Sequence, residues 1–168
     1  MTYSVGDKVV HPGYGPGIII SIEHRQVLGE AKRYYVIDML TEGGTLMTPV
    51  RRADEVGLRP AIGDRAVRRL LKSLSKPPGI LADDFRERQT EVEERLKIGD
   101  IYITAEVVRD LTWHGQVHGL TKRDAQLLQR AEQLLAGELA LVKDIDVKEA
   151  LEQIQAVLAE AIRDQTAK

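Results

Sequence analysis

The fold of the first third of the chain is decided by the stretch KVVHPGYGPGIIISIEH, residues 8–24. A short β-branched segment at residues 7–11 leads into a run dense in Gly and Pro, and the strongly β-prone residues 18–24 follow. Proline fixes φ and glycine permits positive φ, so residues 11–17 are typical of a tight turn. The stretch therefore predicts two strands joined by a turn.

After this stretch, β-prone segments follow at residues 33–39 and 45–50, and Gly-containing turns at residues 28–30 and 42–44 precede them. Four or five short strands in so few residues predict a small curled barrel or SH3-like sheet. After Pro60 the apolar spacing becomes helical, which places a domain boundary near residues 57–63. The predicted helices start after a cap at Asp64, at about residue 84, at residue 101, after a cap at Thr121 and after a cap at Asp146.

The composition limits the possible functions. Among 168 residues, 24 Lys and Arg oppose 26 Asp and Glu, for a net charge of −2, which excludes a protein that coats nucleic acid by charge alone. The chain has no Cys, and therefore no disulfide, thiolate metal site or Cys nucleophile. No apolar run approaches the ~20 residues of a membrane span. The first residues lack the features of a signal peptide, so a cytoplasmic protein is expected.

Candidate chemical motifs have simpler explanations. His114 and His118 have the i, i+4 spacing of a metal pair, but a zinc site needs a third and usually a fourth ligand. The Gly-rich residues 13–17 precede a strand and no Lys-Ser/Thr follows them, so they do not fit a phosphate loop. The sequence therefore predicts no catalysis, no metal and no cofactor.

Two surface features remain. Asp64 is the only acid among residues 63–76, against the five basic residues Arg65, Arg68, Arg69, Lys72 and Lys76. This stripe is either a phosphate-contacting surface or an ordinary solvated helix face. Phe85 is the only Phe, and its i+3 and i+4 neighbours are Arg88 and Gln89, so it has no apolar stripe to join. It is either a plug between helices or an exposed wedge.

Residues 5–17, VGDKVVHPGYGPG, resemble the start of the CarD family of bacterial RNA-polymerase-binding transcription regulators. Residues 29–36, Pro49 and residues 56–59 are similar to the rest of that N-terminal module, which transcription-repair coupling factor shares. In the helical half the similar segments are residues 105–111, 119–121, 134–135 and 138–142. The resemblance covers nearly the whole chain and is weakest after residue 145.

The resemblance implies an α+β architecture with two domains. Residues 1–58 would form a Tudor- or SH3-like small β-barrel that binds the RNA polymerase β subunit. Residues 59–168 would form an all-α bundle of about five helices that contacts promoter DNA in the minor groove at the upstream edge of the bubble. An aromatic wedge there, at the position of Phe85, would stabilise the open promoter complex. A monomer that uses no membrane is expected, associated with the nucleoid through the polymerase.

The resemblance also implies site residues. The polymerase-contacting strand carries a basic residue at the position of Arg25, with Val27 on the same face. Relatives commonly have a second basic residue at the position of Met47, for which Arg51 and Arg52 are candidate substitutes. The predicted DNA-contacting residues are Phe85, the nearby Arg86 and Arg88, and the residues of the basic stripe, Arg65, Arg68, Arg69 and Lys72. Glu87 and Glu91 dilute the charge beside Phe85, which keeps open an adaptor that binds polymerase through the β module with little or no DNA engagement.

Overall fold

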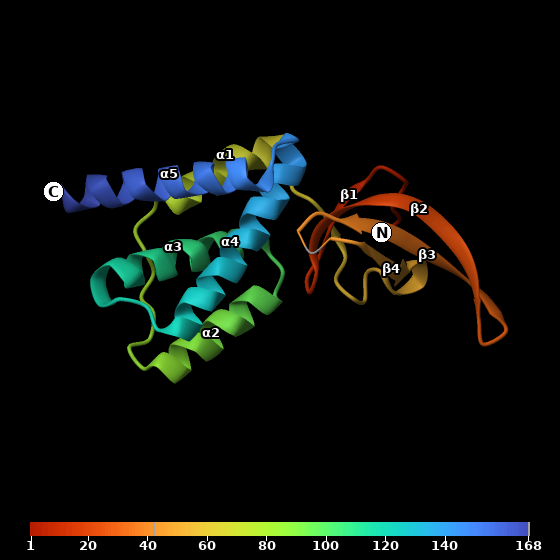
Figure 1. Ribbon diagram of the computed structural model, residues 1–168, viewed down its shortest axis with the longest axis horizontal. Coiled ribbons are helices and arrows are strands. Elements are labelled where there is room, and N and C mark those ends of the chain that lie inside the picture. The colour runs from red at the N-terminus through yellow and green to blue at the C-terminus, as the bar shows by residue number, and fades with distance from the viewer. Residues whose placement is uncertain (42, 168) are drawn as a thin grey trace.

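The computed structural model describes residues 1–41 and 43–167, and its sheet and helices lie on opposite sides of the molecule (Figure 1). The sheet comprises β1 (Lys8–His11), β2 (Gly15–Val27), β3 (Glu30–Met39), β4 (Thr45–Pro49) and β5 (Arg59–Pro60), with a short 3-10 turn, η1 (Val50–Arg52). The helices are α1 (Asp64–Leu74), α2 (Phe85–Lys97), α3 (Ile101–His118), α4 (Lys122–Lys143) and α5 (Val147–Thr166). The predicted α+β architecture is confirmed.

The sheet has the strand order β4-β3-β2-β1-β5, and each neighbouring pair is antiparallel. Strand β2 begins at Gly15, earlier than the sequence predicts, because the Gly-rich residues pair with β1 over Gly15–Ile18. A Cβ on Gly17 would lie 2.6 Å from Ile37 Cγ2 and 2.7 Å from the Asp38 carbonyl oxygen. Glycine is therefore required here by the close approach of β3, and not by a turn.

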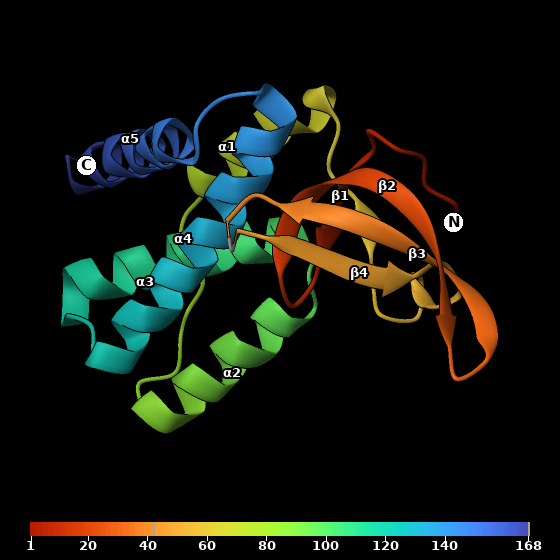
Figure 2. The ribbon, with the colours of Figure 1, turned by 45° about the vertical axis from the view of Figure 1, so that its right-hand side comes forward.

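The β2–β3 hairpin extends well beyond the other strands (Figure 2). Its two-residue turn, Leu28-Gly29, has φ values of 53° and 80°, the positive signs that a type I′ turn requires. This turn pairs Val27 with Glu30 and sets the register of the hairpin. A bulge between Ile19 and Ser21 then shifts the pairing by one residue and increases the local twist.

The sheet has its own small core, built from Tyr3, Val9, Ile19, Tyr35, Ile37, Met39, Ala53 and Leu58. The rings of Tyr3 and Tyr35 meet edge to face, with centroids 5.6 Å apart. The Tyr3 backbone N–H donates to the Tyr35 hydroxyl at 3.0 Å, and the Tyr3 hydroxyl donates to the Leu58 carbonyl at 3.0 Å. These bonds tie the first residues of the chain and the segment after η1 to the sheet.

The helices form a separate core around α3 and α4, which contact the other three helices. In both views α1 and α5 lie on one side of this central pair and α2 lies on the other (Figures 1 and 2). The predicted cap at Thr121 is confirmed as a capping box: the Asp124 N–H donates to Thr121 Oγ1 at 3.1 Å, and the Thr121 N–H donates to Asp124 Oδ2 at 3.0 Å.

Helix α4 joins the helices to the sheet. A Cβ on Gly137 would lie 2.8 Å from Thr41 Cγ2 and 2.9 Å from Pro16 Cγ, so only glycine permits this approach. Beside it Glu138, 1% exposed, accepts two hydrogen bonds from the Arg59 guanidinium at 2.7 and 2.9 Å and one from the Ile62 N–H at 3.0 Å. The division of the chain at residue 58 stays a prediction.

Candidate functional site

One face of the hairpin carries the residues implied to contact polymerase. Arg25 pairs with Lys32, Val27 with Glu30 and Met47 with Val36, and cross-strand partners point to the same side of a sheet. By alternation along the strands, Arg25, Val27 and Met47 lie on one face, opposite the core residues Tyr35 and Ile37. Val27 and Met47 are each 37% exposed, so this hairpin face presents apolar groups beside Arg25.

Arg25 is held in place yet remains accessible. Its Nε and Nη2 atoms donate to the Glu23 carboxylate at 3.2 and 2.9 Å, and its side chain is 58% exposed. An exposed ion pair of this kind adds little stability, but it orients the guanidinium. Strand β1 pairs only with the first residues of β2, so within the described part of the chain the backbone edge near Arg25 has no neighbouring strand.

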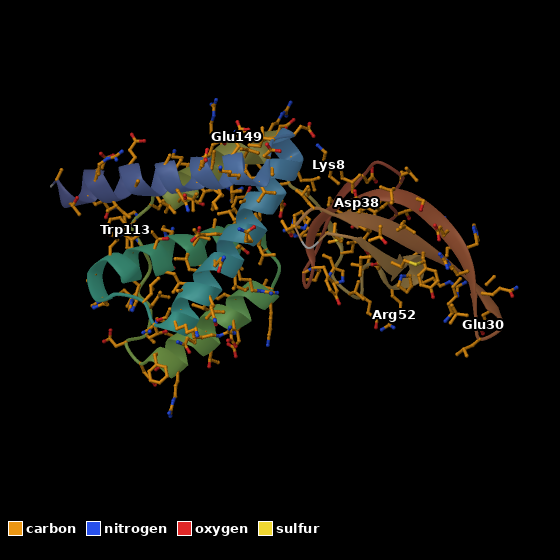
Figure 3. The ribbon with its side chains drawn as sticks, viewed as in Figure 1. Lys8, Glu30, Asp38, Arg52, Trp113 and Glu149 are labelled. Carbon is orange, nitrogen blue, oxygen red and sulfur yellow. The ribbon has the colours of Figure 1, made fainter. Side chains whose placement is uncertain are left out.

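A groove of about 600 Å³ lies where β4 ends and η1 begins. It is lined by the start of β3 and by four basic side chains, Lys32, Arg33, Arg51 and Arg52. Figure 3 shows Arg52 and Glu30 on the part of the sheet remote from the helices. Arg51 lines this groove together with Lys32, the cross-strand partner of Arg25, whereas Met47 is not among its lining residues. Lys32 and Arg33 were not identified from the sequence, although the hairpin turn at residues 28–29 pairs Lys32 with Arg25.

Phe85 is an exposed aromatic at the first position of α2. Its side chain is 48% exposed, which excludes the alternative of a plug between helices. The Asp84 carboxylate caps the helix by accepting from the Arg86 N–H at 3.2 Å, and the Arg86 guanidinium lies 5.5 Å from the Phe85 ring centroid. Phe85 forms one wall of a hollow of about 510 Å³ that His114 and His118 also line. Burial lowers the pKa of His114, and the charge of Arg88 acts in the same direction.

Arg88, which the sequence predicts to contact DNA, lies in the interior of the helical domain. Arg88 is 4% exposed and points inward, where its Nη2 and Nε atoms donate to the two Asp124 carboxylate oxygens at 2.7 and 3.2 Å. Its Nη1 atom donates to the carbonyls of Ala82 and Asp83, each at 3.1 Å. All of its polar atoms are thereby engaged, so Arg88 holds the segment before Phe85 against the start of α4 instead of facing a ligand.

Opposing effects set the charge of Asp124. Burial alone raises the pKa of this carboxyl, but hydrogen bonds from Arg88 and Thr121 outweigh it and lower the pKa to about 2. The same hydrogen bond raises the pKa of Arg88. Both groups are therefore charged at neutral pH, and they form a buried ion pair beneath Phe85.

The basic stripe of α1 is exposed, but it is not near Phe85. Arg65, Arg68, Arg69 and Lys72 are all exposed on α1, whereas α2 lies on the far side of α3 and α4 (Figure 2). The Arg69 guanidinium lies 4.9 Å from the centroid of the Tyr102 ring on α3. The stripe and Phe85 therefore form two separate surfaces, because the order of helices around α3 and α4 separates them.

Residues 1–41 and 43–167 contain neither a cluster of metal-ligating side chains nor a membrane-spanning helix. The rings of His114 and His118 lie 4.8 Å apart, but no cluster there brings together three His, Cys, Asp or Glu side chains suited to a metal ion. None of the described helices combines the length and apolar character needed to cross a membrane.

Comparison with known proteins gives matches along most of the chain. Residues 3–62 match the family model described as "CarD-like/TRCF RID domain", and residues 69–155 match "CarD, C-terminal domain". A protein of Bacillus subtilis (strain 168), "Putative transcription factor YdeB", is 29% identical over 147 residues, which cover 88% of this chain and 96% of that protein.

Among solved structures, the solution NMR structure of the 72-residue N-terminal domain of Myxococcus xanthus CarD is 25% identical. It covers 35% of this chain and 79% of that domain, with a TM-score of 0.31. The CarD family consists of transcription factors and not of enzymes, which confirms the prediction that this protein is not an enzyme. Because the two family models match successive parts of the chain, and together match most of it, the protein belongs to the CarD family of transcription regulators.

Proposed function

We propose that this protein binds the β subunit of RNA polymerase through its sheet and stabilises the open promoter complex through Phe85. The observation that carries the proposal is the presentation of Phe85: an aromatic ring, 48% exposed, at the start of a helix whose first turn is fixed by a buried ion pair. The match of residues 3–62 to the family's "RID domain" supports the polymerase contact.

The hairpin supplies the features that a polymerase contact needs. A strand with a free backbone edge can add to a partner strand, which gives affinity through backbone bonds, while nearby side chains give specificity. Strand β2 has such an edge beyond its pairing with β1, and Arg25 and Val27 lie on it, whereas Met47 lies on the same face of the sheet but two strands away, on β4. The basic groove that contains Arg51 adjoins this region and favours an acidic partner surface.

In this proposal Phe85 binds the open state of the promoter DNA more tightly than the closed state. An apolar ring placed against a distorted base step compensates for lost stacking, which costs a few kcal/mol per step. Because the ring engages DNA that is already opened, it binds the open complex better than the closed one and shifts that equilibrium. Phenylalanine has less stacking area than tryptophan and no N–H donor, so a weaker wedge than that of Trp-containing relatives is expected. Attachment to polymerase raises the effective concentration of the ring at the promoter, which allows a net-acidic protein to act there.

The polymerase contact is tested by replacing Arg25 with Glu. The expected result is about a thirtyfold weaker affinity for the cognate core polymerase, since truncating a central interface residue costs about 2 kcal/mol or more. Binding is measured by biolayer interferometry, with circular dichroism to confirm folding. Arg163→Glu on α5 is the matched control, because it changes the charge by the same amount on the exposed surface of another element. Equal affinities for Arg25→Glu and wild type would remove Arg25 from the interface.

A second candidate function is an adaptor that binds polymerase without engaging DNA. The burial of Arg88 and the distance of the α1 stripe favour it, because they leave only Phe85 and Arg86 of the predicted DNA-contacting residues on that surface. The two candidates differ in one outcome: an adaptor leaves the lifetime of the open complex unchanged when it is bound to polymerase.

A further inference from the structure

The tip of the β2–β3 hairpin carries a leucine in a conformation that leucine seldom adopts. Leu28, the first of the two turn residues, has a φ of 53°, in the left-handed region. A bulky side chain is an outlier in this region, and Asn, Asp or Gly is preferred at this position of a type I′ turn. The left-handed conformation lowers the folding equilibrium constant on the order of tenfold for such a residue.

The Leu28 side chain makes no packing contact that offsets this strain. It is 98% exposed, so nearly all of its surface stays in contact with water. Among the described residues, none of those from 23 to 34 belongs to the core of the sheet. Neither the turn nor the core accounts for a leucine at this position, which indicates a role outside the folded chain.

The hairpin holds its tip away from the rest of the molecule. Strand β2 pairs with β1 only up to Ile18, and β3 pairs with β4 only from Tyr34 onward. Residues 24–27 and 30–33 therefore pair only with each other within the described chain and form a two-stranded ribbon. Figure 3 shows Glu30, the first residue of β3, at the end of this ribbon remote from the helices. The tip is thus accessible to a partner that the other strands and the helices do not reach.

We propose that Leu28 is an apolar anchor that enters a pocket on the β subunit of RNA polymerase when the hairpin binds that subunit. The identity of the partner rests on the proposed function. Leu28 follows Arg25 by three residues, or about 10 Å along an extended strand. A partner strand added to the free edge of β2 would therefore end close to Leu28.

The surroundings of Leu28 fit an interface with an apolar centre and a charged rim. Val27 is half-buried and continues the apolar surface of the tip. The charged side chains of Arg25, Glu30 and Lys32 lie on the adjoining part of the ribbon. Interfaces commonly bury an apolar centre and leave polar and charged groups accessible at the rim. Because burial of a leucine side chain strengthens binding by about tenfold or more, a partner pocket would offset the strain of the free turn.

The first experiment uses Leu28→Asn, which is expected to change stability and affinity in opposite directions. Asn is favoured in the turn, so the midpoint of thermal unfolding should rise by about 2 °C. The affinity of the full chain for the cognate core polymerase, measured by biolayer interferometry, should fall by about tenfold. Ile80→Asn is the matched control, because Ile80 is an equally exposed aliphatic residue between α1 and α2, and its replacement should leave the affinity unchanged. Equal affinities for wild type and Leu28→Asn would overturn the proposal.

Two further variants make the result specific. Leu28→Met keeps an apolar side chain of similar size, so its affinity should stay within about twofold of wild type. Arg25→Glu separates failure of the anchor from failure of the proposed function. Weak binding by Arg25→Glu with unchanged binding by Leu28→Asn would refute the anchor alone, whereas unchanged binding by both variants would refute the polymerase contact as well.

A crosslinking experiment identifies the partner surface independently of affinity. The chain has no Cys, so Leu28→Cys and Ile80→Cys each provide a single attachment point for a benzophenone photo-crosslinker. In the complex with core polymerase, residue 28 is expected to crosslink to the β subunit, and residue 80 is not. Crosslinks from residue 28 only to another polymerase subunit, or only to a second copy of this chain, would contradict the assignment of Leu28 to the β subunit.

Discussion

Replacing Arg88 with Met is expected to lower the free energy of unfolding by about 3–5 kcal/mol, because it leaves the Asp124 carboxylate buried without its partner. Asp124 is fully buried, and Arg88 supplies two of its hydrogen bonds, at 2.7 and 3.2 Å. The Ala82 and Asp83 carbonyls lose their Arg88 donor as well. The loss is measured by urea denaturation and is expected to appear in the midpoint with little change in the m-value.

Arg123→Met is the matched control for stability. The Arg123–Glu93 pair joins the same two helices at 2.6 Å, but its side chains are 51% and 40% exposed. Exposed pairs contribute about 0–1 kcal/mol, so this substitution is expected to change stability little. Similar losses for Arg88→Met and Arg123→Met would show that the buried ion pair does not stabilise the fold.

The Arg88–Asp124 pair also predicts a pH dependence. The folded-state pKa of Asp124, about 2, lies below its ordinary value of 3.8, so the folded state favours the charged carboxylate. The resulting stability is fully present above the unfolded-state pKa and is lost as the pH falls toward the folded-state pKa. The difference in stability between wild type and Arg88→Met is therefore expected to shrink between about pH 4 and pH 2. A difference that is constant over this range would contradict the assigned origin of the shift.

Replacing Arg59 with Met is expected to lower the free energy of unfolding by about 3 kcal/mol. The reason is that Glu138, where the sheet meets α4, would stay buried without its ion-pair partner. Glu138 is 1% exposed, and without Arg59 it keeps only the hydrogen bond from the Ile62 N–H. Lys8→Met is the control: the Lys8–Asp144 pair also joins the sheet side to the end of α4, but Asp144 is 82% exposed. Thermal unfolding should show a large loss for Arg59→Met and little for Lys8→Met, whereas equal losses would contradict this role of Glu138.

The contact between the sheet and α4 matters for the proposed mechanism because it connects the two proposed contact surfaces, the β2–β3 hairpin and Phe85. Arg59 and Glu138 help to hold the sheet against α4, and Arg88 and Asp124 hold the start of α2 against the other end of α4. A sheet bound to polymerase would thus place Phe85 at a defined position. At a temperature where Arg59→Met remains folded, we expect it to bind polymerase normally but to prolong the open complex less than wild type does.

The sequence predicted the helices and strands well where turn or cap residues mark their ends. The turn residues Leu28-Gly29 mark the hairpin. Thr121 and Asp146 occupy the N-cap positions of α4 and α5, but only the Thr121 side chain makes a capping hydrogen bond. The start of β2 was misplaced because glycine-rich residues commonly form turns. Gly17 instead lies in a strand, where the neighbouring strand leaves no room for a side chain.

The candidate sites were less predictable because they depend on contacts between distant segments. Arg88 was assigned to the surface by its charge, and nothing near it in the sequence identifies Asp124, 36 residues later, as its partner. Helical periodicity shows that Arg65 and Phe85 lie on polar faces, but it does not specify the order of helices that separates them.

The most direct test of the central claim is the lifetime of the open promoter complex formed by the cognate polymerase holoenzyme. A fluorescent base near the upstream edge of the bubble reports the lifetime without factor, with wild type and with Phe85→Ala. We predict that wild type prolongs the lifetime, and that Phe85→Ala binds polymerase equally well but loses most of this gain. Wild type that binds polymerase without changing the lifetime, or Phe85→Ala that retains the full gain, would contradict the account.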